Sequence, residues 1–126
     1  MSQPKIVYRA LTRERTPSDK SFRLRPATEH RPVEEFLSIA TSKEKAIGPL
    51  DAKGWASLVV EKIEAIPGVT VRVKVNQPDP PDLDLLEVVG LPRHDDPDSE
   101  KITNYAQAML LCVVASGPAK KEASSG

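Results

Sequence analysis

The chain has 126 residues, 39% of them hydrophobic, so we expect one domain with a modest core. Its 18 basic and 18 acidic side chains cancel, which disfavours a function driven by overall attraction to nucleic acid or anionic lipid. No apolar run reaches the roughly 18 residues needed to cross a bilayer. A single cysteine, Cys112, excludes an internal disulfide and a multi-cysteine zinc site.

The first nine residues also lack the apolar stretch of a secretory signal. We therefore expect a cytoplasmic protein with no membrane attachment, no metal and no cofactor.

The first third of the chain predicts two short strands separated by a long loop. Ile6–Leu11 is mostly apolar and begins with β-branched residues, which is typical of a strand. Residues 12–31 are polar and proline-rich, but Phe22 and Leu24 alternate with arginines, so this loop should dock one extended piece on the core. Residues 36–40 predict a second buried strand.

Helices are predicted at three places. Thr41 or Ser42 can cap a short helix that ends at Gly48. Asp51 can cap a longer helix that ends before Pro67, because apolar residues recur there at three- and four-residue steps (Trp55, Leu58, Val59, Ile63 and Ile66). A last helix should begin after Asp98 or Ser99 and end at Gly117, with an apolar face formed by Ile102, Tyr105, Ala106, Met109, Leu110, Val113 and Val114.

Two further strands are predicted between the long helices. Residues 69–75 alternate valines with Thr70, Arg72 and Lys74, so one face of this strand should be in water. Residues 83–89 form the other strand. The order predicts an α+β two-layer domain over residues 1–116, in which a three- to four-stranded sheet packs two long helices on one face. Residues 117–126 are small and polar and are expected to form a disordered tail.

Charge is unevenly distributed along the chain. Residues 1–26 contain seven basic and two acidic side chains, a balance of +5, whereas residues 79–100 contain one basic and eight acidic side chains, a balance of −7. Three interpretations remain open: solvated loop charge, a basic recognition patch in the N-terminal third, or pairing between the two segments.

Few residues suggest catalysis. His30 and His94 lie in separate loops, and the acidic run after His94 has no calcium-loop spacing. Cys112 falls on the apolar stripe of the last predicted helix, as a core cysteine does. The sequence contains no glycine-rich phosphate loop and no nucleophile elbow, and its predicted strands lack the aromatic platform of an RNA-binding sheet. An enzymatic role is therefore not favoured.

One arrangement resembles ADP-ribosyltransferase-like toxins. Arg9 lies on the first strand, Ser38 and Thr41 lie on or just after the second, and Glu87 lies on a late strand. The resemblance implies that Arg9 grips the phosphates of a nicotinamide dinucleotide, that Ser38 and Thr41 shape the pocket, and that Glu87 aids transfer. The chain departs from the family in reading Ile-Ala-Thr-Ser where the family has Ser-Thr-Ser, and in having Leu85 two residues before Glu87.

The favoured hypothesis is a non-catalytic binding or accessory module. It would contact another protein, or a second copy of itself, through an edge strand at residues 69–75 or through a charged patch. Its expected contact residues are Arg23, Arg25, Arg72 and Lys74. The two alternatives are the dinucleotide-dependent enzyme described above and nucleic-acid binding through the arginine-rich first third.

Overall fold

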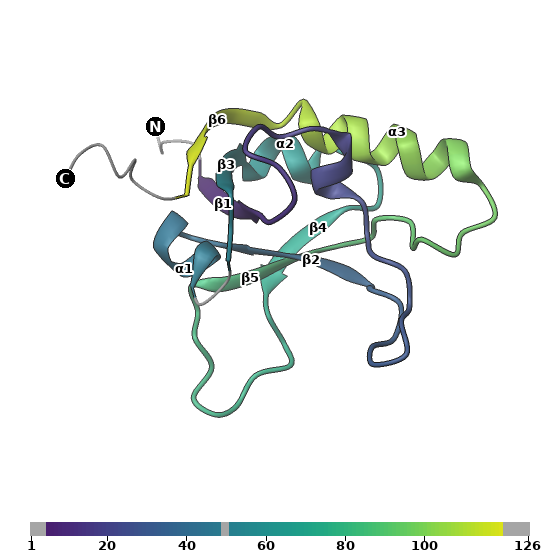
Figure 1. Ribbon diagram of the computed structural model, residues 1–126. Helices are drawn as coiled ribbons and strands as arrows, with labels where there is room; N and C mark the ends of the chain where they lie inside the picture. Colours follow the sequence, from purple (N-terminus) through teal and green to yellow (C-terminus); the bar gives the residue numbers. More distant parts are fainter. Residues whose placement is uncertain (1–4, 49–50, 120–126) are drawn as a thin grey trace.

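The computed structural model describes residues 5–48 and 51–119, and its centre is one sheet of six antiparallel strands (Figure 1). The strand order is β4-β5-β2-β1-β3-β6. The strands are β1 (Ile6–Leu11), β2 (Phe36–Ala40), β3 (Gly54–Val59), β4 (Thr70–Val73), β5 (Leu85–Val89) and β6 (Val113–Pro118). The protein is α+β, but the predicted three- to four-stranded sheet is wrong, because two strands come from segments that we expected to be helical.

The helices are shorter than predicted. They are η1, a 3-10 helix (Asp19–Phe22), α1 (Lys43–Ile47), α2 (Val60–Glu64) and α3 (Ser99–Leu110). Within the described residues only α3 exceeds two turns, so the prediction of two long helices on one face is also wrong.

The predicted helix after Asp51 is instead strand β3 followed directly by the short helix α2. Ala56 and Leu58 point into the core, while Trp55 lies on the other face, where its ring contacts Tyr8 at a centroid distance of 5.9 Å. A strand paired on both sides and covered on both faces has a continuous apolar run. Such a run also matches a helical stripe, so periodicity alone does not distinguish the two structures.

The predicted last helix divides in the same way. It begins as expected, because the Asp98 side chain accepts a hydrogen bond from the amide of Lys101. It ends at Leu110, and the chain then continues as β6 along β3. The expected tail of residues 117–126 therefore starts inside a strand, and residues 120–126 lie outside the described part of the chain.

Several local predictions are confirmed. Strands β1 and β2 have the predicted bounds, and β4 and β5 lie within the predicted ranges. Ser42 caps α1 by accepting from the amide of Lys45. Phe22 and Leu24 are buried in the core, whereas Thr70 and Arg72 are exposed on β4.

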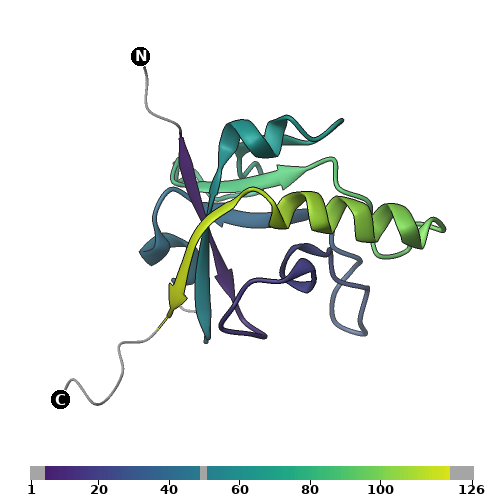
Figure 2. The ribbon, with the colours of Figure 1, turned by 90° about the horizontal axis from the view of Figure 1, so that it is seen from above.

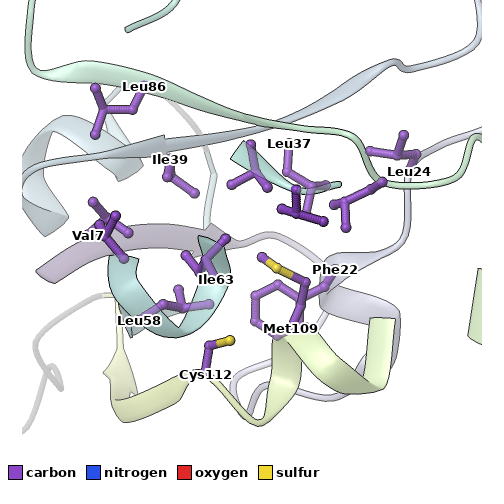
Figure 3. Packing of buried hydrophobic residues seen from close by; sticks show 14 residues of the cluster. Val7, Phe22, Leu24, Leu37, Ile39, Leu58, Ile63, Leu86, Met109 and Cys112 are labelled. Carbon is purple, nitrogen blue, oxygen red and sulfur yellow. The ribbon is translucent and has the colours of Figure 1, made fainter. Parts of the chain in front are cut away.

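The hydrophobic core lies on one face of the sheet, here called the inner face, under α2, α3 and the segment that contains η1 (Figure 3). Its centre includes Val7, Leu37 and Leu58 from the strands, with Phe22 and Met109 from the covering segments. Helix α1 packs on the opposite, outer face, where Lys43 Nζ lies 5.2 Å from the centre of the Trp55 ring.

The sheet is strongly twisted, so that β1 and β3 run across the direction of β2 and β5 (Figure 2). Strands β1 and β2 share a single paired position, Tyr8 with Ala40. Beyond it β1 diverges from β2, and the chain of residues 12–26 folds over the inner side of the diverging end.

Candidate functional site

A hollow that is rich in positive charge lies beside the end of β1. Its volume is about 340 Å³, within the range of small-molecule sites. The end of β1, the loop of residues 12–14, η1 and the extended piece of residues 23–26 form its walls, together with His94 from the loop after β5. Five lining side chains are cationic (Arg9, Arg13, Lys20, Arg23 and Arg25) and one, Glu14, is anionic, which gives a formal balance of +4 with His94 neutral. We call this feature the basic hollow.

Arg9 connects three parts of the structure in this hollow. Its Nε donates to the carbonyl oxygen of Ser21 at 2.8 Å, and its Nη1 donates to the carbonyl oxygen of Ser38 at 2.9 Å. No carboxylate of the described residues forms an ion pair with it. Burial lowers the pKa of Arg9 to about 10; Glu34 raises that pKa and the positive charge of Arg25 lowers it. Arg9 is thus a charged, partly desolvated group that lacks a directly bonded anion.

Arg23 and Arg25 each donate hydrogen bonds from one side of the guanidinium group to the protein. Arg25 Nη2 donates to Thr12 Oγ1 at 3.0 Å, and Arg23 Nη2 donates to Asp19 at 2.9 Å and to Thr103 at 3.1 Å. By contrast, the side-chain nitrogens of Arg13 and Lys20 make no hydrogen bond or ion pair with the part of the chain that the structure describes. The hollow therefore contains three guanidinium groups that hydrogen bonds hold in place, and two cations, Arg13 and Lys20, whose charged groups have no such partner.

Glu14 is the single carboxylate of the lining, and its charge is already satisfied. One of its oxygens accepts hydrogen bonds of 2.6 Å from the hydroxyls of Ser18 and Ser21. These two donors hold the pKa of Glu14 below its usual range. A general base works best when its pKa is near the working pH, so this carboxylate is poorly suited to activate Ser21.

Comparisons with protein-family models, with curated proteins and with solved structures find no match to the chain.

The four residues of the toxin-like arrangement do not converge on one site, although Ser38 is next to Glu87 in the sheet and its carbonyl oxygen accepts from Arg9. Arg9 lies on the inner face of β1 with Val7 and Leu11, whereas Glu87 alternates with the core residues of β5 and therefore points to the outer face. The Ser38 side chain lies on the outer face as well, in register with Glu87. Thr41 Oγ1 donates to Asp84 instead, at 2.8 Å.

Glu87 has a different partner, Arg72. The two residues are in register on β5 and β4, and Arg72 Nε donates to Glu87 Oε1 at 2.8 Å. Glu87 is 1% exposed and its second oxygen has no hydrogen-bond partner among the described residues, while Arg72 is 50% exposed. The pair thus joins a buried anion to a half-exposed cation across the sheet.

We expect Arg72→Met to lower the free energy of unfolding by about 2–3 kcal/mol, because it leaves the Glu87 charge buried without its partner. The figure lies below that for breaking a fully buried pair, since Arg72 is half in solvent. In a Glu87→Gln background the same substitution should lower stability by about 1 kcal/mol or less. Urea unfolding of the four proteins measures this coupling, and equal losses in both backgrounds would contradict it.

The expected contact residues fall into two separate groups. Arg23 and Arg25 line the basic hollow, whereas Lys74 lies beside a smaller hollow of about 60 Å³ on the outer face, and Arg72 is engaged with Glu87. Strand β4 lies at an edge of the sheet, but the amide of Val71 donates to the carboxylate of Glu64 at 3.0 Å. A strand that docks there must displace this contact.

The acidic segment of residues 79–100 forms ion pairs with basic side chains that lie outside the first third of the chain. Four of its carboxylates pair in this way (Asp82 with Lys45, Glu87 with Arg72, Asp95 with Arg93, and Asp96 with Lys101). None of these four contacts uses a cation of the basic hollow, in which Arg23 alone has a carboxylate partner among the described residues, Asp19.

The described residues give no indication of metal binding or of a membrane-spanning helix. They contain no group of three His, Cys, Asp or Glu side chains that could hold a metal ion, and none of their helices has the length and hydrophobicity to cross a bilayer. Cys112 is buried as expected, and burial raises the pKa of its thiol.

Sequence reasoning counted Arg13 and Lys20 in the basic segment but gave them no role, and it left His94 in a solvated loop. Only the fold places the loop after β5 beside residues 9–26.

Proposed function

We propose that the protein is a small non-catalytic binding module that receives an anionic group of its partner in the basic hollow. The observation that carries this proposal is the guanidinium of Arg9, which faces a hollow with four further cations and bonds only to neutral carbonyl oxygens. An incoming anion would compensate a charge that the protein itself leaves without a bonded carboxylate.

The lining supports binding rather than catalysis. Its single carboxylate is already hydrogen-bonded to two hydroxyls, and the protein's thiol is buried in the core. Glu14 is therefore poorly suited to serve a nucleophile as its base, and His94 is the other side chain of the lining that could act as one. The cations, by contrast, can donate charge-assisted hydrogen bonds to an anion, and such bonds are stronger than those between neutral groups.

Charge reversal at the rim tests the proposal. We expect at least one of three anionic probes (pyrophosphate, citrate and polyglutamate) to bind saturably in calorimetry at low salt. The variant Arg13→Glu/Lys20→Glu should weaken that binding by about tenfold or more, because each charge-assisted contact is worth about 1.5 kcal/mol. These two side chains are exposed and make no hydrogen bond or ion pair with described residues, so the fold should tolerate their replacement.

The matched control is Arg31→Glu/Lys62→Glu, which reverses one exposed arginine and one exposed lysine that do not line the hollow. It changes the net charge by the same amount and should leave affinity within about twofold of the unaltered protein. The absence of binding by all three probes, or equal weakening by the two variants, would refute the proposal.

A further inference from the structure

We infer that the anionic group is a phosphoryl group with two or more negative charges, presented without a nucleobase that the protein recognises. This inference rests on the proposed binding function and specifies its ligand. Three features of the basic hollow support it: the predominance of arginine, the amount of positive charge, and the size and composition of the walls.

The first feature is the kind of cation. Four of the five cationic side chains are arginines, whose planar fork of N–H donors matches the oxygens of a phosphoryl group better than the single ammonium of lysine does. Contacts at one edge orient Arg9, Arg23 and Arg25 in advance. Because these side chains are already ordered, little conformational entropy is lost when their remaining N–H groups meet a ligand.

The second feature is the amount of charge. The lining has a formal balance of +4, and Asp19 outside it compensates one arginine. A single carboxylate would leave most of this charge unbalanced, whereas a phosphate monoester carries about −1.5 to −2 at neutral pH. Linked phosphoryl groups carry more. The hollow is therefore matched to a compact, multiply charged anion.

The third feature is the wall itself. The volume of about 340 Å³ is near the lower end for small-molecule sites, and the lining contains no Phe, Tyr or Trp, so that its single aromatic ring is the imidazole of His94. Proteins that bind single-stranded nucleic acid usually provide aromatic rings on which bases stack. With one imidazole and no larger ring, the hollow can hold phosphoryl oxygens but offers little stacking surface for a base.

Calorimetry at constant ionic strength tests this inference with two small anions of similar charge. Pyrophosphate should bind about tenfold or more tightly than citrate, which presents carboxylates instead. Arg25→Lys keeps the charge and removes the fork. It should therefore weaken pyrophosphate binding by about fivefold to tenfold and change citrate binding by less than about twofold.

The outcomes separate the inference from the proposed function. If citrate or polyglutamate binds as tightly as pyrophosphate, or if Arg25→Lys weakens both anions equally, the phosphoryl inference fails while anion binding stands. If no anion binds, both fail. Tighter binding of a single-stranded RNA than of pyrophosphate would also overturn the inference, since RNA phosphodiesters carry one charge each.

Two sources can supply a phosphoryl group, and a peptide pair distinguishes them. If a phosphoserine peptide binds at least as tightly as pyrophosphate while its unmodified form does not bind, the source is a modified protein. Tighter binding of pyrophosphate identifies a small phosphate compound. Either result supports the phosphoryl inference, provided that citrate remains the weaker ligand.

Discussion

Gly90→Ala should lower the free energy of unfolding by about 3 kcal/mol or more, the largest effect that we expect from adding one methyl group. Gly90 has a φ of +98°, a backbone conformation that residues with a side chain rarely adopt. A Cβ atom there would collide with the carbonyl oxygen of Gly68 and approach the Cα of Val69 at 3.1 Å. Backbone atoms at the start of β4 cannot move aside without breaking the pairing with β5.

Gly68→Ala is the matched control for this prediction. Gly68 also has a positive φ, +80°, but a Cβ atom at this position would meet nothing within 4 Å. The substitution should therefore add only backbone strain, about 1–2 kcal/mol. Denaturant unfolding of both variants separates strain from collision, and equal losses would show that the close approach at Gly90 is unimportant.

Phe22→Ala should lower the free energy of unfolding by about 3–5 kcal/mol, as expected for the loss of a fully buried ring. Phe22 is 1% exposed and anchors η1 to the core beside Met109 (Figure 3). Since η1 carries Lys20 and the carbonyl oxygen that accepts from Arg9, the same change should also disturb the basic hollow.

Phe22→Leu supplies the control, because it keeps most of the apolar volume and should lower stability by about 1 kcal/mol. Anion affinity measured by calorimetry should remain within about twofold in Phe22→Leu and fall in any folded Phe22→Ala protein. A loss of less than about 1 kcal/mol in Phe22→Ala would mean that η1 is held by other contacts.

The parts of the fold that could be predicted are those with clear boundaries in the sequence. Strands β1 and β2 are short apolar runs flanked by polar segments, and α1 has a capping serine at one end and Gly48 at the other. Strand β3 could not be identified in this way. Its apolar residues lie on both faces and continue into α2 without an intervening glycine or proline. The same sequence therefore also matches the apolar stripe of an amphipathic helix.

Strand β6 was missed for a related reason. Val113 and Val114 continue the apolar stripe of α3, but the helix ends at Leu110, three residues before Val113, without a glycine or proline. The change from helix to strand depends on a tertiary contact. Residues 113–118 can form backbone hydrogen bonds with the side of β3 that β1 leaves unpaired. A single sequence does not reveal that unpaired strand.

The basic hollow was only partly accessible to sequence reasoning. The charge count pointed to residues 1–26, and Arg23 and Arg25 were among the expected contact residues. Alternation along β1 could not show which side of the sheet Arg9 faces, because both faces of this strand carry apolar residues. The separation of Arg9 from Glu87 became visible only with the sheet complete.

The two outer strands of the sheet have a consequence for behaviour at high concentration. On β4 the carboxylate of Glu64 occupies the amide of Val71, and on β6 a register shift opposite Ser57 and Leu58, together with the missing amide hydrogen of Pro118, interrupts the regular ladder. Fibrils grow when unpaired backbone groups of one molecule template those of the next. Each edge strand of the sheet thus has a feature that interferes with regular pairing to another strand, and these features oppose the assembly of copies of the chain into amyloid.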